Sequence, residues 1–468
     1  MSKLTDWTFY DLEQHMWELH LETFRHAMVE ILSMMDDHFM ATRDQARYQY
    51  KEKKERTVVT RLGPVTFKRR YYWDTKEHVW VYLLDQALEL DPRSQISAGL
   101  RELAVLWATQ GPSYRDAAKR LQDLFGHRVL SHETIRQLLL AASDALQKDE
   151  PAPAPRKEVE IIFIEADGFW TGVQRQGRKT RRKRETHLVV VHEGWQQRQG
   201  KGAKADYRLQ NPLYVPVISG SIEEIWEQVW TAVAQRYKNL SATQVIINGD
   251  LAAWIRSGVG QFTRALYQYD RFHLKREARK VLGSDSLYRH DALVQIDQNN
   301  PQGLLHVLRQ AEKAAQDPER KDALARFAQL IANHQEAVVD YRQRLKDAGR
   351  KVPDTWRGMG AAESNVDRFK LRTAKRGRAW SFKGLQAILH LLGRFYEGTL
   401  PNELKRAARV SATKLQSEEL PPLSAGKVAK TVGHEPFSVP RAGFPALAQG
   451  TQGYAKLFRR MTNTCPTG

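Results

Sequence analysis

The order of strand-like and helix-like segments after residue 158 limits the possible folds of this chain more than any other feature. Apolar runs rich in β-branched and aromatic residues predict strands, and these lie at 159–166, 186–192, 207–218, 244–248 and 265–269. A helical pattern at 221–237 and a short helix after residue 250 separate the later strands. Three strands in a row, followed by alternating helix and strand, predict a mixed sheet with helices packed on it.

The residues after this sheet region carry a different pattern. Residues 271–356 are charged and helical throughout, and helices resume around Glu363 and over 381–396. We therefore interpret 271–356 as an all-helical insertion in a sheet domain built from 158–270 and 357–400. The basic segment 401–468 is interrupted by Pro, Gly and Ser, so we expect an irregular tail there.

Alternating prolines in Glu150-Pro-Ala-Pro-Ala-Pro155 exclude a helix and make 150–157 the clearest linker. Upstream, 94–149 contains a helix that Ser113 would cap and Gly126 would end, and a second helix that Ser131 would cap. Two short helices joined by a tight turn predict a helix-turn-helix DNA-binding domain, with a plain helical pair as the alternative. The second helix of such a motif meets base edges with its first residues, which here are His132, Glu133, Arg136 and Gln137.

Apolar residues at spacings of three and four predict one long amphipathic helix over 6–40, within an N-terminal region 1–56. Its apolar stripe could join two protomers or pack on its own domain, and both interpretations stay open. A β-hairpin region follows at 57–93, with a predicted turn at Gly63-Pro64. One face of its second strand carries Lys68, Arg70 and Tyr72, and this basic, aromatic face could lie along a DNA backbone or form a solvated edge.

Charge composition points to a polyanionic partner. Seventy-three Lys and Arg against 54 acidic residues give a net charge of +19 and a pI of about 9.8, which favours nucleic acid. Seven of these cations stand within 175–184, in a predicted loop between the first two strands, where they could clamp DNA phosphates or be solvated. The candidates in this run are Arg178, Lys179, Arg181, Arg182, Lys183 and Arg184.

The single cysteine, Cys465, excludes a disulfide framework and a CxxC zinc pair, which suits a reducing cytoplasm. The sequence has no apolar run near the roughly 20 residues of a membrane span, and its N-terminus lacks a signal-peptide core. We therefore expect a cytoplasmic protein without a membrane partner.

Three acidic residues stand where a metal-dependent nuclease needs them. Asp167 and Asp250 each end an apolar strand-like run, and Glu363 opens a helical segment. Cleavage of a phosphodiester by two Mg²⁺ (or Mn²⁺) ions needs carboxylates that hold the metals about 3.5–4 Å apart. Each acid alone is more often a cap or a turn former, but the three together predict a metal site. Glu165 shares a strand face with Asp167 and could support the site or pair with an arginine.

Several short segments resemble bacterial insertion-sequence transposases of the ISLre type, relatives of the Mutator-like transposases. They are Ile164-Glu-Ala-Asp167-Gly, Asn248-Gly-Asp250-Leu-Ala-Ala-Trp254, Tyr269-Asp270-Arg-Phe-His273 and Ala362-Glu363-Ser-Asn-Val. The resemblance covers roughly residues 45–400. It implies a DDE triad of Asp167, Asp250 and Glu363 on a ribonuclease-H-like α/β fold with a helical insertion, as part of an α+β multidomain protein.

Mutator-like transposases also carry an acidic residue or Cys three positions before a His, and Asp270 and His273 match this pattern. The resemblance implies that His273 contacts the scissile phosphate or positions a catalytic group, and a structural histidine is the alternative. Gly168-Phe169-Trp170 departs from the family, because further acids are expected after the first aspartate.

The function implied is that of a DNA transposase. It would bind the terminal inverted repeats of its element as a homodimer or higher oligomer in the bacterial nucleoid. Water would cut the strand by in-line attack, and the freed 3′-hydroxyl would then attack target double-stranded DNA. Two alternatives are a non-catalytic DNA-binding protein on the same scaffold and a ribonuclease-H-like nuclease or resolvase.

Overall fold

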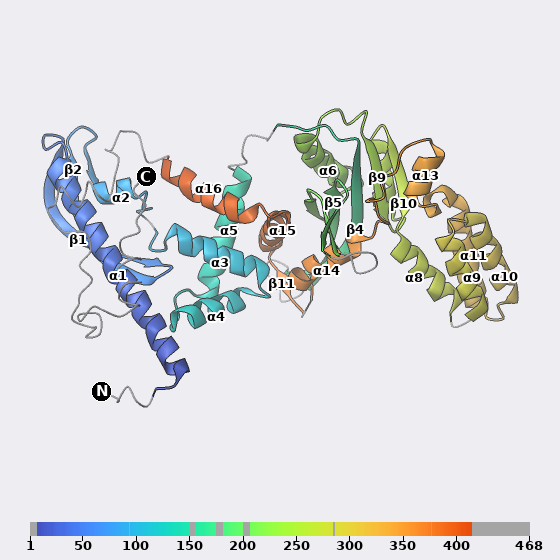
Figure 1. Ribbon diagram of the computed structural model, residues 1–468, viewed down its shortest axis with the longest axis horizontal. Coiled ribbons are helices and arrows are strands. Elements are labelled where there is room, and N and C mark those ends of the chain that lie inside the picture. The colour runs from blue at the N-terminus through green and yellow to red at the C-terminus, as the bar shows by residue number, and fades with distance from the viewer. Residues whose placement is uncertain are drawn as a thin grey trace. The chain divides into compact units, whose positions relative to one another are not determined.

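The chain has a mixed α/β fold with several sheets (Figure 1). The computed structural model describes residues 7–92, 94–148, 155–174, 181–199, 206–283, 286–375 and 377–413. Two compact units form, the first from residues 1–104, 117–132 and 404–468, and the second from 105–116 and 133–403. Within the described ranges, no helix combines the length and the apolar character that a membrane crossing requires.

The first unit begins with helix α1 (Phe9–Thr42), which confirms the long helix predicted over 6–40. Thr8 and Asp11 cap it reciprocally, each side chain accepting a hydrogen bond from the other residue's backbone N–H. A three-stranded sheet follows, formed by β1 (Tyr48–Thr60), β2 (Gly63–Asp74) and β3 (Val79–Val81), with a short helix α2 (Leu83–Ala87) after it. The charged stretch before residue 57 is thus mostly strand β1.

The β1–β2 hairpin differs from its prediction in two details. Thr60 pairs with Gly63, so the turn lies at 61–62 and the predicted turn at Gly63-Pro64 is wrong: Pro64 already pairs with Val59. A register shift lies between Tyr50 and Glu52, where Lys51 of β1 has no partner on β2, while Tyr71 and Tyr72 of β2 pair in succession.

Tyr72, which we predicted on the outer face beside Lys68 and Arg70, is fully buried in the core, where its hydroxyl lies 3.8 Å from Met40 Sδ of α1. That core joins α1, α2 and the sheet, and its buried residues are Leu32, Phe39, Val58, Val65, Phe67, Tyr72, Leu83 and Leu84.

Four further helices are α3 (Ala98–Gln110), α4 (Tyr114–Phe125), α5 (His132–Lys148) and, near the end of the described chain, α16 (Leu400–Thr413). The Ser113 hydroxyl accepts a hydrogen bond from Asp116 N, which confirms the predicted cap of α4. Gly126 has a φ of +72°, a conformation that suits the predicted end of that helix. Helix α16 corrects the expectation of an irregular chain from residue 401. Residues 414–468, which include Cys465, lie outside the described residues, as do 150–154 of the predicted linker 150–157.

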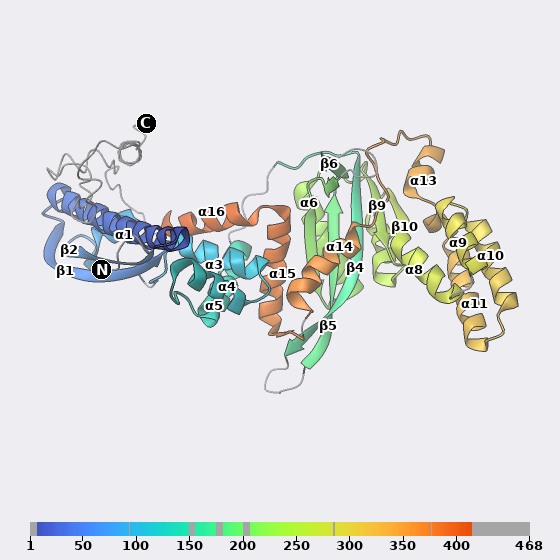
Figure 2. The same ribbon diagram turned by 60° about the horizontal axis from the view of Figure 1, so that its bottom comes forward.

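The second unit contains a six-stranded sheet in the order β10-β9-β4-β5-β8, with β11 (Ala379–Trp380) beside β4 (Figure 2). Its strands are β4 (Ile161–Gln174), β5 (Arg181–His192), β8 (Leu213–Ile218), β9 (Gln244–Gly249) and β10 (Ala265–Tyr269). Strands β4, β9 and β10 are parallel to one another, and β5 is antiparallel to both β4 and β8.

Two predicted strands have different limits in the structure. Strand β4 runs on to Gln174 instead of ending at 166, because β5 pairs with it along its whole length. The predicted strand 207–218 is two strands, β7 (Asp206–Leu209), which pairs with β6 (Trp195–Gln199), and β8. Asn211, with a φ of +48°, lies in the break between them.

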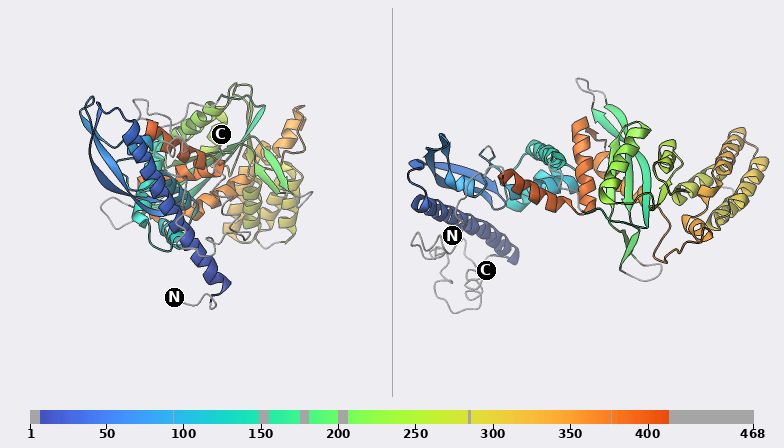
Figure 3. Two further views of the ribbon diagram at one scale, coloured as in Figure 1. Left: turned by 60° about the vertical axis from the view of Figure 1, so that its left-hand side comes forward. Right: turned by 90° about the horizontal axis from the view of Figure 1, so that it is seen from above.

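Helices cover both faces of this sheet (Figure 3). Helix α6 (Ile222–Arg236), capped by Ser221, packs on the face that carries Ile162, Ile164 and Ala166. Helices α14 (Ala361–Thr373) and α15 (Phe382–Glu397) pack against the sheet through β4, β5 and β8. The short segments α7 (Ala253–Arg256) and η3 (Ser257–Gln261) lie between β9 and β10.

The segment 271–356 contains helices and no strand where the structure describes it. Its helices are α8 (Arg271–Leu282), α9 (Ser286–Asp297), α10 (Pro301–Ala314), α11 (Pro318–Asn333), α12 (Gln335–Val338) and α13 (Tyr341–Asp347). Helices α8 to α12 share an apolar core with Tyr269 at the end of β10, whereas Tyr341 and Leu345 of α13 pack with Phe163 of β4. This places the start of α8 directly at the sheet edge that β9 and β10 form.

Candidate active site

Asp167 and Asp250 lie just beyond the point where the pairing of β4 with β9 ends. The parallel pairing of β4 with β9 ends at Glu165 and Asn248, and Asp167 and Asp250 each stand two residues beyond that pair. Asp167 is therefore inside β4 rather than at its end as predicted, but its neighbour on the β9 side has stopped. Asp167 is buried, whereas Asp250 is exposed and accepts a hydrogen bond from Ala252 N at 3.0 Å.

Two helices bring their first turns to this edge. Glu363 lies in the first turn of α14, and His273 lies in the first turn of α8. One potential ligand atom from each of Asp167, His273 and Glu363 lies within 4.8 Å of the others, and His273 Nε2 is 4.0 Å from Glu363 Oε2. The structure thus gathers three of the predicted residues closely and places Asp250 outside this group of three.

Asp270 holds the imidazole of His273 in place. Its Oδ2 lies 2.7 Å from His273 Nδ1 and accepts a bond from His273 N at 3.0 Å. Burial opposes ionisation of Asp270, but the bonds from His273 and Asn248 prevail and lower its pKa. Burial likewise opposes the charged form of His273, yet Asp270 raises the pKa of this imidazole above its usual value. With Nδ1 bound to Asp270, Nε2 is the atom directed at the acids.

Burial raises the pKa of the Asp167 carboxyl, and the nearby charge of Asp250 adds to this rise. A hydrogen bond of 2.7 Å from Gly168 N and the positive field of His273 and Lys370 oppose it only in part. A cation bound here would therefore favour the ionised form of Asp167. Two carboxylates and an imidazole nitrogen are suitable ligands for a divalent metal ion.

Of the two roles that the sequence left open for Glu165, support of the site or pairing with an arginine, its contacts fit the first. It is fully buried, and its Oε2 accepts hydrogen bonds from the backbone N–H groups of Gly360, Ala361 and Ala362, at 2.9, 2.7 and 3.2 Å. These are the orphan donors at the start of α14, which has no side-chain cap of its own. Glu165 thus caps, from the sheet, the helix that carries Glu363.

Asn248 and His192 complete this buried network, and sequence reasoning missed both. Asn248 Nδ2 donates to Asp270 Oδ1 at 3.1 Å and lies 3.4 Å from Glu165 Oε2, while His192 Nε2 lies 3.2 Å from Glu165 Oε1. The sequence gives one signal for the role of Glu165. Gly360-Ala-Ala offers no side chain that could cap the first N–H groups of the helix, so an acceptor from another element can serve them. The network links the α14 and α8 termini through β4 and β9.

The two basic residues of the β1–β2 hairpin that we predicted to contact DNA differ in exposure. Lys68 is exposed. Arg70 is half-buried and pairs with Asp36 and Asp37 at 2.8 and 2.7 Å, so it joins β2 to α1. Two carboxylates thus already pair with Arg70, and its contact with DNA stays a prediction.

On α5, His132, Glu133 and Gln137 are exposed, and Glu133 accepts hydrogen bonds from both Arg136 and Gln137. Of the basic run, Arg178 and Lys179 lie outside the described residues, as does the side chain of Arg181. The remaining cations, Arg182, Lys183 and Arg184, belong to strand β5 and not to a loop, because they pair with β4 at 171–173.

Comparison with known proteins assigns the chain to a family. Residues 3–409 match the family described as uncharacterised protein family UPF0236, and the chain belongs to it. A relative from Streptococcus gallolyticus, named UPF0236 protein in vanSb 3′region, is 26% identical over 388 residues, which are 82% of each chain.

Two relatives come from Caldanaerobacter subterraneus subsp. tengcongensis. UPF0236 protein TTE2489 is 24% identical over 350 residues, which are 75% of this chain and 70% of the relative. Another is 23% identical over 350 residues, 75% of this chain and 69% of the relative, and its name joins eleven locus designations.

Proposed function

We propose that this protein is a DNA transposase that cuts and joins DNA at a DDE-type site formed by Asp167, Asp250 and Glu363. The observation that carries the proposal is the convergence of Asp167, Glu363 and His273 within 4.8 Å at the edge where the strand leading to Asp250 ends. Asp167 and His273 stand 106 positions apart in sequence, and His273 and Glu363 stand 90 positions apart. Such a cluster is the arrangement that metal-dependent phosphodiester chemistry needs.

The topology of the second unit supports a ribonuclease-H-like catalytic domain. Its central strand β4 is parallel to β9 on one side and antiparallel to β5 on the other, and the helices α8 to α13 stand between strand β10 and Glu363. The transposase resemblance implies both features. The relative whose name joins eleven loci of one organism also fits a sequence that exists in many copies, as a mobile element does.

The residues of the site fit a divalent metal ion. Asp167 and Glu363 offer carboxylate oxygens and His273 offers Nε2, a mixed set that Mn²⁺ accepts readily and Mg²⁺ accepts through its oxygens. Asp250 stands beside Asp167 and would serve the second ion of a pair. Bound ions would activate the attacking hydroxyl and stabilise the leaving oxygen.

The chain's own groups orient this chemistry. Asp270 fixes the tautomer and direction of His273, so that Nε2 points toward Asp167 and Glu363. Glu165 fixes the first turn of α14 and with it the backbone of Glu363. Helices α4 and α5 would act as a helix-turn-helix that reads the terminal repeats through His132, Glu133, Arg136 and Gln137, and Lys68 would contact phosphate.

The test is cleavage of DNA that carries the element ends, with Mg²⁺ or Mn²⁺ added. We expect Asp167→Asn and Glu363→Gln each to lower cleavage by at least about 100-fold, with binding of the ends retained. Asp367→Asn is the matched control, because Asp367 is an exposed acid on the same helix and pairs only with Lys375 among the described contacts. Binding without cleavage by the wild-type protein under either ion would favour the non-catalytic DNA-binding alternative.

A further inference from the structure

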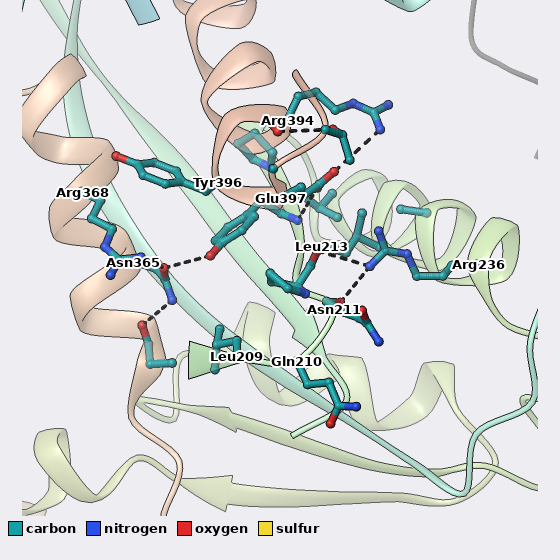
Figure 4. Close-up of a pocket in the computed structure, with 18 of the residues that line it drawn as sticks. Leu209, Gln210, Asn211, Leu213, Arg236, Asn365, Arg368, Arg394, Tyr396 and Glu397 are labelled. Atoms are coloured by element: carbon teal, nitrogen blue, oxygen red, sulfur yellow. Dashed lines mark hydrogen bonds and ion pairs between the residues drawn. The ribbon is translucent and has the colours of Figure 1, made fainter. Parts of the chain in front are cut away.

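A large groove opens in the second unit beside the edge strand β8 (Figure 4). Its volume is about 2180 Å³, and residues of α6, β8, α14, α15 and the β6–β7 hairpin line it. Pockets for small molecules usually measure about 300–1,000 Å³, so this groove suits a larger occupant.

The lining of the groove is strongly cationic. Seven basic residues face only two acidic ones, Glu227 and Glu397. The basic residues are Lys157, Arg198, Arg208, Arg236, Arg357, Arg368 and Arg394. This imbalance predicts an anionic occupant.

Several of these arginines are satisfied by neutral groups and keep an uncompensated charge. Arg236 Nη1 donates to the main-chain oxygens of Asn211 and Pro212 at 2.9 and 3.2 Å. Arg368 Nη1 donates to Asn365 Oδ1 at 3.4 Å and is exposed, as are Arg208 and Arg357. Two of the seven cations differ because carboxylates pair with them. Lys157 Nζ lies 2.5 Å from Glu193 Oε1. Arg394 Nη1 lies 3.8 Å from Glu397 Oε2 and 3.7 Å from Glu403 Oε1.

Aromatic rings lie among these cations. The guanidinium of Arg357 lies 3.9 Å from the ring centre of Tyr207, and that of Arg368 lies 5.7 Å from the ring centre of Tyr396. Figure 4 shows Tyr396 between Arg368 and Arg394 on the wall of the groove. Arginines that follow a phosphate backbone, with aromatic rings on which bases stack, are the features of single-strand binding sites.

We propose that this groove binds an unpaired strand of DNA through its phosphates, with Tyr396 and Tyr207 contacting bases. The proposal deepens the function proposed above and rests on it. Gly360 and Ala361 line the groove, and Glu363 follows two residues later on the same helix, directed at His273 instead. A strand leaving the groove past the N-terminus of α14 therefore reaches the acidic cluster, which is the path expected for the strand that becomes unpaired beside the cleaved bond.

The experiment measures binding apart from chemistry. The full-length protein is titrated against a fluorescent oligothymidine strand in the presence of EDTA, and anisotropy is recorded at low and moderate salt. We expect the double variant Arg236→Ala/Arg368→Ala to bind about tenfold more weakly and with a shallower salt dependence. Arg309→Ala, which removes an exposed arginine of α10 outside the groove, should bind like the wild type.

Folding and specificity need two further measurements. Arg368→Lys keeps the charge and should retain most of the affinity, while circular dichroism melting of each variant shows that the fold is intact. Unchanged single-strand binding by the double variant would overturn the proposal, as would an equal loss of affinity for a matched duplex. Because no metal is present, the groove can fail while the wild-type protein still cuts DNA, and the transposase assignment can fail while the groove still binds the strand.

Discussion

Glu165, which is not a member of the proposed triad, makes more hydrogen bonds at the candidate site than any of the three triad acids. Its carboxylate accepts from three backbone N–H groups of α14, from His192 and, at longer range, from Asn248, which also holds Asp270. A buried carboxylate is costly unless it is fully hydrogen-bonded, and these donors meet that condition. Glu165 thereby couples the positions of Glu363 and His273 to the sheet.

Glu165→Gln should weaken this coupling while keeping side-chain size. A glutamine offers one acceptor oxygen in place of two, so its amide group must face either the α14 donors or His192 and Asn248. We expect a loss of about 1–3 kcal/mol in the free energy of unfolding and a lower maximal cleavage rate with unchanged affinity for DNA. Glu160→Gln is the control, because Glu160 is exposed just before β4. Wild-type stability and rate in Glu165→Gln would disprove the positioning role.

His390 makes the stability of the second unit depend on pH. It lies on α15 with Nδ1 3.1 Å from Ser143 Oγ of α5, and burial, reinforced by the charge of Arg394, lowers the pKa of this imidazole to about 4. The unfolded chain has a histidine pKa near 6.5, so it takes up the proton first as the pH falls. The stabilisation is complete above about pH 6.5 and decreases as the pH falls from there toward 4.

Between pH 7 and pH 5 this group should cost about 2 kcal/mol of stability. Denaturant unfolding of the wild type and of His390→Leu at both pH values measures it, and the variant should lose clearly less stability on acidification. His306→Gln, which changes an exposed histidine on α10, should follow the wild type. An equal pH dependence in the wild type and His390→Leu would contradict the assignment.

At the scale of elements, the short η3 segment fits against α6 only because of a glycine. A Cβ added to Gly258 would lie 2.1 Å from Cζ2 of Trp226, a fully buried ring whose Nε1 donates to Trp254 O at 2.6 Å. Gly258→Ala should therefore destabilise the protein by about 1–3 kcal/mol through overpacking. Gly260→Ala in the same segment should be nearly neutral, since nothing lies within 4 Å of its added Cβ. Thermal melting of the two variants compares them, and equal melting temperatures would refute the steric argument.

The elements that the sequence predicted well are those whose signals are local. Helix α6 has its own Ser221 cap, β9 is an unbroken apolar run, and both appear within a residue or two of their predicted limits. The burial of Tyr72 has no such signal, because it depends on contact with α1, where Met40 lies against the Tyr72 hydroxyl. The extent of β4 depended on its pairing with β5, which period-two alternation does not determine.

The candidate site shows the same division. Asp167 and Glu363 could be predicted because an apolar strand and a helix each mark them locally, and His273 came from the resemblance. The role of Glu165 could not, because its partners Gly360 to Ala362 are about 195 positions away in sequence. Whether Asp250 or His273 stands closest to Asp167 likewise depends on how α8 starts at the end of β10, which is a property of packing.

At the scale of the whole molecule, α1 carries one more apolar stripe than its own unit uses. Leu21, Leu32 and Phe39 are buried against the first unit. Four other large side chains at intervals of seven residues stay exposed: Tyr10 by 68%, Trp17 by 44%, Phe24 by 45% and Ile31 by 39%. A sustained seven-residue repeat is the pattern with which one helix packs along another.

We therefore expect two copies of the protein to associate through α1, in keeping with the proposed chemistry on two DNA ends. Phe24→Glu/Ile31→Glu should shift the protein to monomers, because both charges would be buried in the seam, while Trp17 is left in place since its Nε1 lies 3.2 Å from Leu124 O. Size-exclusion chromatography with light scattering gives the mass of each form. Leu287→Glu, which alters a 65% exposed leucine on α9, should leave the dimer intact. A wild-type protein that is monomeric at all concentrations, or a double variant that remains dimeric, would show that the stripe on α1 has another occupant.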